Sequence, residues 1–316
     1  MSKIKNFKTI FPAISVPIND DDLINEPKFR RYLRWLASFY DDGIKGIVTN
    51  GHTGEITALN REERKRVTAI AADEVGDKMT IVSGVSSKNT REAIETAKDA
   101  KEAGAEGILL MPPHMWLRFG MNPKSPFDWV KDVAEGADID IVIHLYPATT
   151  KAFYPLDTLV KMCTEIPHVK AIKMGTRLQS VEVRTLRKVS PDTALLTCHD
   201  ETICNSLFPG MDGAVLGFAG CIPELITKAF KVYRQGSCQE LHEIDDKIFP
   251  VERAIYRGGQ PSGEAHARLK QVLVDRGVFD NAHMRKPVLP LTVESKETIA
   301  KGVLDSGLKK VNINEF

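Results

Sequence analysis

The sequence predicts a single (β/α)8 barrel, or TIM barrel, followed by a C-terminal extension of three helices. Two observations lead to this α/β fold class. Short apolar runs alternate with longer amphipathic segments eight times, and after about residue 236 only helical segments follow. Such alternation is typical of a parallel sheet, and the count of eight favours a closed barrel over an open doubly wound sheet. No GxGxxG motif follows the first run, which weakens the dinucleotide-binding alternative.

Eight apolar runs are the predicted strands. They are rich in Val and Ile and apolar nearly throughout, as parallel strands buried on both faces are. The runs are residues 10–16, 43–50, 79–85, 107–112, 139–146, 169–174, 193–198 and 213–218. Helix starts are also recognisable, because Asn60 with Glu63 and Asn89 with Glu92 have the spacing of capping boxes.

The barrel is expected to occupy residues 1–236 and the helical extension residues 237–316. Three periodic segments, 238–256, 262–276 and 293–305, predict the helices of the extension. The gaps between them contain Gly and Pro, which are typical of loops.

Composition favours a cytoplasmic protein that acts on small molecules. The formal net charge is +1 and the charges are dispersed, whereas a nucleic-acid or anionic-membrane surface needs a basic cluster. The first apolar stretch is short and interrupted by prolines, so neither a signal peptide nor a membrane span is expected. The five cysteines form no CxxC pair, which favours reduced thiols over disulfides or zinc. We expect no metal and no cofactor.

Lys173 is the first candidate catalytic residue. It lies near the end of the predicted strand 169–174, and the catalytic groups of (β/α)8 barrels come from the C-terminal ends of strands. Burial disfavours the ammonium form of a lysine, and the neutral amine is the form that attacks a ketone to make an imine. The alternative is a lysine that only reaches solvent at the barrel mouth. Lys170, on the same strand, is expected to point outward.

Two further candidate groups lie at strand ends. In the turn 51–55 (Gly-His-Thr-Gly-Glu), two glycines allow backbone N–H groups to face a small anion, and Thr53 adds a hydroxyl. An ordinary strand-to-helix turn is the alternative. His144 and Tyr146 are two positions apart on one strand and therefore face the same side, where they are candidates for acid–base catalysis. A core histidine with a satisfied hydrogen bond is the alternative for His144.

Taken in this order, these residues resemble the family that includes dihydrodipicolinate synthase and N-acetylneuraminate lyase. The resemblance runs from about Phe11 to Leu308. It is carried by the turn 51–55 with Arg61-Glu62-Glu63-Arg64, then by Gly84-Val85-Ser86, Pro112-Pro113, Ile172-Lys173 and the segment 213–217. The resemblance implies a pyruvate-dependent class I aldolase on a (β/α)8 barrel with three extra helices. It also implies a homotetramer built from two dimers, and a 2-oxo acid and an aldehyde as small-molecule partners.

The resemblance also implies a role for each candidate residue. Lys173 is the expected Schiff-base lysine, His52 and Thr53 the expected binding turn for the 2-oxo acid carboxylate, and Val215 the strand-eight residue that faces the bound pyruvate unit. Protons are expected to move through His144, Tyr146 or both.

Three positions depart from the pattern of dihydrodipicolinate synthase. His52 replaces the first of two threonines, His144 replaces a tyrosine, and Thr149 replaces the arginine that binds the second substrate. We therefore expect a Schiff-base lyase that is not an efficient dihydrodipicolinate synthase. Two alternatives stay open: a non-catalytic barrel that binds a 2-oxo acid, and a dehydratase of a sugar-derived 2-oxo acid.

Overall fold

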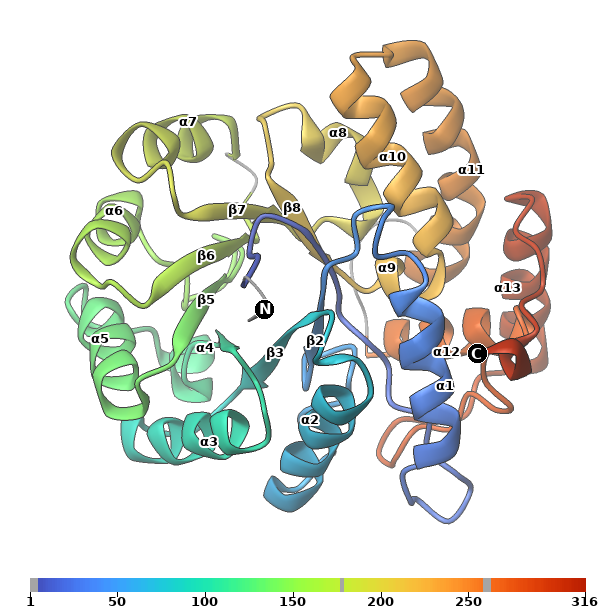
Figure 1. Ribbon diagram of the computed structural model, residues 1–316, viewed down its shortest axis with the longest axis horizontal. Coiled ribbons are helices and arrows are strands. Elements are labelled where there is room, and N and C mark those ends of the chain that lie inside the picture. The colour runs from blue at the N-terminus through green and yellow to red at the C-terminus, as the bar shows by residue number, and fades with distance from the viewer. Residues whose placement is uncertain (1–4, 177–178, 258–262) are drawn as a thin grey trace.

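Eight parallel strands form a ring in the order β1-β8-β7-β6-β5-β4-β3-β2 (Figure 1). The computed structural model describes residues 5–176, 179–257 and 263–316 of the chain. The two ends of the strand order meet through a parallel bridge between Ala13 and Val48. The helices surround the ring, so the prediction of a (β/α)8 barrel is confirmed.

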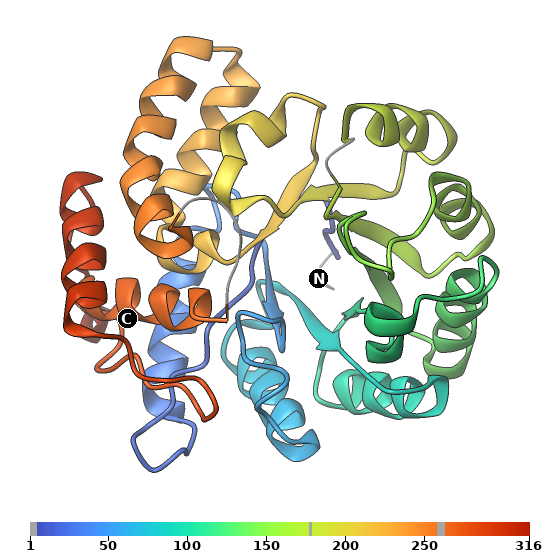
Figure 2. The ribbon, with the colours of Figure 1, turned by 180° about the vertical axis from the view of Figure 1, so that it is seen from behind.

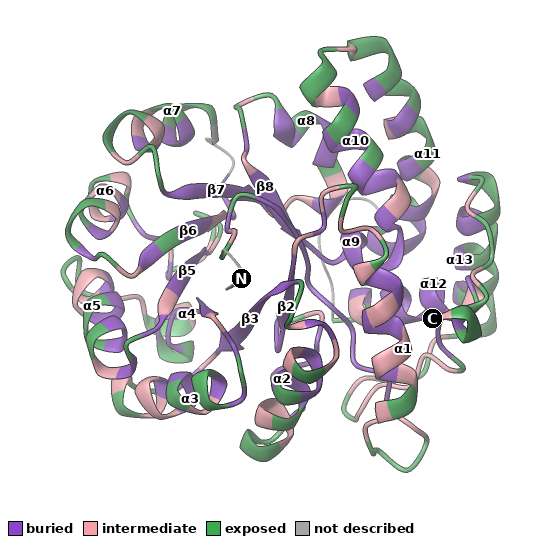
Figure 3. Ribbon diagram, viewed as in Figure 1, coloured by how far each residue is buried: buried purple, intermediate pink, exposed green. Residues whose placement is uncertain are grey.

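All eight strands fall within the predicted apolar runs. They are β1 (Ile10–Pro12), β2 (Gly46–Thr49), β3 (Thr80–Val85), β4 (Gly107–Leu110), β5 (Asp140–Leu145), β6 (Val169–Met174), β7 (Ala194–Thr197) and β8 (Gly213–Leu216). Every strand except the start of β5 and two positions of β6 is fully buried, as the purple ring of Figure 3 shows. Burial on both faces is the reason that these strands are recognisable as continuous apolar runs.

The helices alternate with the strands and expose their outer faces (Figure 3). Those of the barrel are α1 (Glu26–Ala37), α2 (Arg61–Val75), α3 (Thr90–Glu102), α4 (His114–Phe119), α5 (Ser125–Ala137), α6 (Leu156–Glu165), α7 (Gln179–Val189), α8 (Ile203–Leu207), α9 (Phe218–Cys221) and α10 (Pro223–Gln235). Short 3-10 helices cover Asp200–Thr202 and Ile313–Glu315. No helix of the described residues is long and apolar enough to cross a membrane.

One of the two predicted capping boxes is complete. At α2, the Asn60 side chain accepts from the Glu63 N–H, and the Glu63 carboxylate accepts in return from the Asn60 N–H. At α3, Asn89 caps the N–H of Glu92, but the Glu92 carboxylate accepts from the N–H of Lys88 instead of that of Asn89. The predicted helix start is therefore right, but the hydrogen bond expected from the Asn89 N–H to the Glu92 carboxylate is wrong.

Apolar side chains fill the barrel interior. This group includes Phe7, Phe11, Val48, Val82, Leu109, Val142, Ala171, Leu196 and Val215. Phe7 precedes β1, and its ring centroid lies 6.4 Å from that of Phe11, so aromatic rings pack the end of the barrel at which the strands begin. A polar site is therefore expected at the opposite end of the barrel, where the strands end.

The C-terminal extension consists of α11 (Cys238–Tyr256), α12 (Ala265–Asp275) and α13 (Val293–Asp305) and lies against one side of the ring (Figures 1 and 2). Three helices were predicted there, and the first and third have the predicted bounds. The predicted start of the second, at residue 262, lies outside the described residues. The extension shares one apolar core with α1 and α10, so residue 236 marks a change of pattern, and its role as a domain boundary stays a prediction.

A buried ion pair joins the extension to the barrel mouth. The ammonium of Lys270, on α12, contacts the carboxylate of Glu55, in the turn after β2, and their side chains are only 1% and 3% exposed. Lys270 also donates to the carbonyl of His283 at 2.8 Å. A second link is made by Arg285, whose guanidinium binds both carboxylate oxygens of Glu63.

Replacing Lys270 with Met should destabilise the fold, because the Glu55 carboxylate would stay buried without its cation. Removal of one partner of a buried pair usually costs about 3–5 kcal/mol. Chemical denaturation monitored by circular dichroism measures the loss. The matched control is Lys301→Met, which breaks an exposed helical pair with Asp305 and should change the midpoint little. Equal midpoints for the two variants would contradict a stabilising role of the Glu55–Lys270 pair.

Candidate active site

Lys173 lies on the interior side of the barrel. It is two positions after Ala171, a member of the interior apolar group, and side chains two apart on a strand share a face. In the parallel ladders Lys173 pairs with His144 of β5 and with Leu196 of β7. Lys170 is exposed, as expected. The structure thus places Lys173 near the C-terminal end of an interior strand, and its catalytic role stays a prediction.

His144, Tyr146 and His52 form a cluster of rings beside Lys173. The ring centroids of His144 and Tyr146 are 4.7 Å apart, and those of His144 and His52 are 5.5 Å apart. The Tyr146 hydroxyl lies 3.1 Å from Nε2 of His52, within hydrogen-bond distance. Strand alternation therefore placed His144 and Tyr146 correctly on one face, and the structure adds His52 to them.

His144 does not have the contacts of a structural core histidine. Its side chain is buried, with 7% of the residue exposed, and Nδ1 has no hydrogen-bond partner among the described residues. A buried polar atom without a partner costs free energy. The alternative of a satisfied core histidine thus loses support, and a ring nitrogen is left for a bound molecule.

Burial sets the protonation state of this cluster. Burial, and then the nearby Lys173, hold the pKa of His144 well below its ordinary value of 6.5. Burial raises the pKa of Tyr146 well above 10. The same two causes lower the pKa of His52, although this residue keeps an exposed edge and solvent moderates the effect. Near neutral pH the site therefore holds a neutral imidazole, able to accept a proton, beside a protonated phenol, able to donate one.

The turn after β2 closes on itself through two backbone hydrogen bonds. The Glu55 N–H donates to the His52 carbonyl at 2.9 Å, and the Ile56 N–H donates to the Gly51 carbonyl at 3.2 Å. The Thr53 hydroxyl lies next to Gly217, where an added Cβ would come within 3.3 Å of it. The turn thus brings His52 and Thr53 to the end of β8.

Val215 packs inside the barrel, in the same apolar group as Ala171. It lies on β8 opposite Phe11 of β1 and is 1% exposed. The structure therefore brings all six predicted site residues to the interior or mouth of the barrel. The roles assigned to them stay predictions.

Asp200, just after β7, is a residue for which no role was predicted. Its carboxylate accepts from the N–H groups of Gly217 and Phe218, at 3.2 and 2.9 Å, and from the Tyr256 hydroxyl at 3.0 Å. Burial raises the pKa of Asp200 to about 6. This residue fixes the end of β8 and ties it to α11. A place after an apolar strand was the only sequence signal for it.

His266, in the first turn of α12, was also missed. Burial and the nearby Lys173 lower its pKa to about 4, so its imidazole is neutral and close to the candidate lysine. No local pattern could identify it, because it lies more than ninety positions after Lys173 in an ordinary helix.

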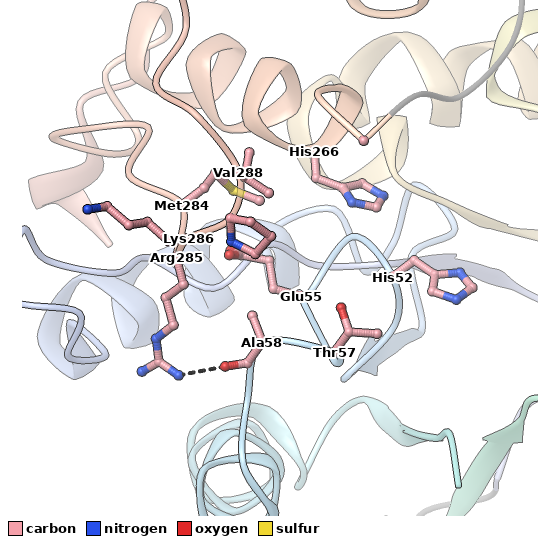
Figure 4. A pocket seen from close by; sticks show the side chains of 11 residues that line it. His52, Glu55, Thr57, Ala58, His266, Met284, Arg285, Lys286 and Val288 are labelled. Carbon is pink, nitrogen blue, oxygen red and sulfur yellow. Dashed lines mark hydrogen bonds between the residues drawn. The ribbon is translucent and has the colours of Figure 1, made fainter. Parts of the chain in front are cut away.

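A cavity of about 300 Å³ lies between the turn after β2 and the extension (Figure 4). His52 and Glu55 line it from the barrel, and His266 lines it from α12. The loop that contains Met284, Arg285, Lys286, Pro287 and Val288 forms the opposite wall. The extension thus forms part of the mouth of the barrel.

The cysteines and histidines do not indicate a second kind of site. All five cysteines are free thiols. Burial raises the pKa of Cys198 to about 11, and its thiol donates to the Met174 carbonyl at 3.4 Å, so it is not poised as a nucleophile. Within the described part of the chain, no group of three or more His, Cys, Asp or Glu side chains is placed to hold a metal ion.

A (β/α)8 barrel with titratable side chains at its C-terminal mouth has the features of a barrel enzyme, because the active sites of such enzymes lie at that mouth. Within that class, the chain belongs to the dihydrodipicolinate synthetase family, which it matches over residues 6–305. This is a family of aldolase-type lyases that form a Schiff base with pyruvate. The family that the motifs indicated is therefore confirmed.

Relatives and solved structures agree with this assignment. The chain is 26% identical over 303 residues to 4-hydroxy-tetrahydrodipicolinate synthase of Bartonella bacilliformis, covering 96% of this chain and 99% of the relative. It is 30% identical over 257 residues to the synthase of Methanothrix thermoacetophila, covering 81% and 84%. The fold matches that of YagE, a family protein of Escherichia coli K12 solved in complex with pyruvate. The TM-score is 0.84 at 21% identity, and the match covers 96% of this chain and 100% of YagE.

The His144 imidazole should stay neutral in the folded protein as the pH falls through about 6.5, where a free histidine takes up a proton, because burial holds its pKa well below that value. The unfolded chain takes up a proton on this ring as the pH falls through about 6.5, and the folded protein does not, so this group makes the fold less stable as the pH falls. Ring 15N shifts of labelled histidines measure the titration, and His144→Gln identifies the signals. A midpoint near 6.5 for His144 would contradict its burial in an uncharged form.

Proposed function

We propose that this protein is an aldolase-type lyase in which Lys173 forms a Schiff base with a 2-oxo acid of the pyruvate type. The observation that supports this most is the place of Lys173, on the interior face of β6 at its C-terminal end and in register with His144. An amine there meets a substrate that enters the mouth of the barrel. Family membership makes imine formation the chemistry expected of it.

The reaction begins when the Lys173 amine adds to C2 of the 2-oxo acid and water leaves, giving the imine. The protonated imine withdraws electrons, so C3 loses a proton and an enamine forms. The enamine carbon then attacks the carbonyl carbon of an aldehyde, and hydrolysis of the product imine releases Lys173. The reverse sequence cleaves the same bond. Loss of hydroxide from the carbon next to C3 would make the reaction a dehydration through the same imine.

The turn after β2 holds the carboxylate of the 2-oxo acid in this scheme. The Thr53 hydroxyl and the His52 ring lie at the end of the barrel that Lys173 faces, and Val215 lines the interior beside the reacting carbon. Donors that are fixed before the reaction stabilise charge without reorganising during it.

The proton acceptor in this scheme is His144. It is the direct ladder neighbour of Lys173, it is neutral, and its Nδ1 has no partner among the described residues. Tyr146 is the competing candidate, but its hydroxyl is already within hydrogen-bond distance of His52. These titratable groups also argue against the alternative of a barrel that binds a 2-oxo acid without catalysis.

Efficient dihydrodipicolinate synthase activity is not part of this proposal. Thr149 is exposed after Pro147 and offers no positive charge for an acidic aldehyde. We further propose a cytoplasmic homotetramer, a dimer of dimers, as the family resemblance implies. The five free thiols agree with a reducing compartment.

Incubation with pyruvate and borohydride should add the mass of a reduced pyruvate adduct to the peptide that contains Lys173. Peptide mass spectrometry locates the adduct, and Lys173→Met is the negative control. Lys170→Met is the matched control, because Lys170 is on the same strand but exposed, and it should keep the adduct. An adduct on another lysine, or none with any 2-oxo acid, would refute the proposed function.

His144→Gln should lower turnover by roughly 10²–10⁴, the range for losing a general acid or base, while the borohydride adduct still forms. Tyr146→Phe should have a much smaller effect, because only its contact with His52 is lost. Turnover of a hydroxylated 2-oxo acid in the cleavage direction provides the rate. The opposite order of effects would make Tyr146 the relay.

A further inference from the structure

The cavity between the barrel and the extension continues the candidate active site. His52 belongs to both, because it lines the cavity and contacts the ring cluster next to Lys173. His266 lines the cavity from α12, and Lys173 is close enough to affect its protonation. His52 and His266 therefore connect the surroundings of Lys173 to the cavity.

Every described charge in the walls of this cavity has a partner or is directed away from it. Glu55 is paired with Lys270. Arg285 is held by Glu63 and by the carbonyl of Ala58. Lys286 is exposed, and Figure 4 shows its side chain pointing away from both histidines. A charged group in the cavity would therefore lose its water without gaining an ion-pair partner, which is costly.

The remaining wall is apolar or neutral. Ala58, Met284, Pro287 and Val288 provide carbon surface, Thr57 provides a hydroxyl, and His52 and His266 provide ring nitrogens. The cavity volume of about 300 Å³ exceeds the roughly 150 Å³ of an apolar protein cavity that binds benzene. The volume of the cavity, its largely apolar wall and the pairing of its described charges therefore fit an uncharged, ring-sized group. Such a group could carry one polar atom that forms a hydrogen bond with an imidazole.

We propose that this cavity binds the uncharged, ring-sized substituent of the aldehyde that reacts with the 2-oxo acid bound to Lys173. The inference rests on the proposed function, which supplies the imine, and it adds the class of the second substrate. The extension then has a direct part in specificity, through His266 and the loop that contains Val288.

Binding and turnover test this with benzyl alcohol, benzaldehyde and glyoxylate. Saturation-transfer NMR should detect benzyl alcohol bound to the wild-type protein without any 2-oxo acid. With pyruvate, kcat/KM for benzaldehyde should exceed that for glyoxylate, a charged aldehyde without a ring, by at least about tenfold, the scale of selectivity in an apolar pocket.

Val288→Trp should fill the cavity, abolish the benzyl alcohol signal and lower kcat/KM for benzaldehyde by at least about tenfold. Leu289→Trp is the matched control, because the next residue is 76% exposed and does not line the cavity. It should behave as wild type. Ala58→Leu fills the cavity from the opposite wall and replaces Val288→Trp if that variant melts early by circular dichroism.

Three results would each overturn the proposal, and the first two are wild-type binding in both cavity-filling variants and a preference for glyoxylate over benzaldehyde. Absence of benzyl alcohol binding to wild type would do the same. The borohydride experiment distinguishes a failure of this proposal from a failure of the proposed function, because it tests imine formation by Lys173 separately. Benzyl alcohol binding without any Lys173 adduct would leave a binding cavity but refute both imine formation and the role of the cavity in it.

Discussion

The contact between Glu55 and Lys270 is the constraint on which the mouth of this barrel depends. The carboxylate belongs to the turn that presents His52 and Thr53, and the ammonium belongs to the helix that presents His266. Two charges buried this deeply are tolerated only together, because either alone would lack compensation. This contact holds the turn against α12, and the bonds of Arg285 to Ala58 and Glu63 hold the loop that forms the other wall of the cavity.

Three imidazole rings lie near Lys173. By the family resemblance, His52 and His144 stand where dihydrodipicolinate synthase has threonine and tyrosine, and His266 approaches from outside the barrel. Burial, and then the nearby Lys173, lower the pKa of all three rings, although solvent moderates the effect at the exposed His52. Near neutral pH an imidazole of lowered pKa is present in the form that accepts a proton, whereas a phenol, with an unperturbed pKa of about 10, is still protonated.

The fold and half of the site could be predicted because their signals are local. Strands buried on both faces are continuous apolar runs, and an interior lysine at the end of such a run is conspicuous. Strand alternation placed His144 and Tyr146 on one face. Asp200, His266 and Lys270 gave no such signal, since their roles come from contacts between distant segments. The Glu92 carboxylate was misassigned for a smaller reason, because the N–H of Lys88 lies within reach of the same oxygen.

The link between Glu63 and Arg285 spans 222 positions of the chain. Domains begin to fold during synthesis, at about 5–20 residues per second, so roughly 10–45 s separate the appearance of these two residues. Lys173 is synthesised within that interval, before the loop that contains Arg285 and forms one wall of the cavity. The mouth of the barrel is thus completed only after the extension has been synthesised.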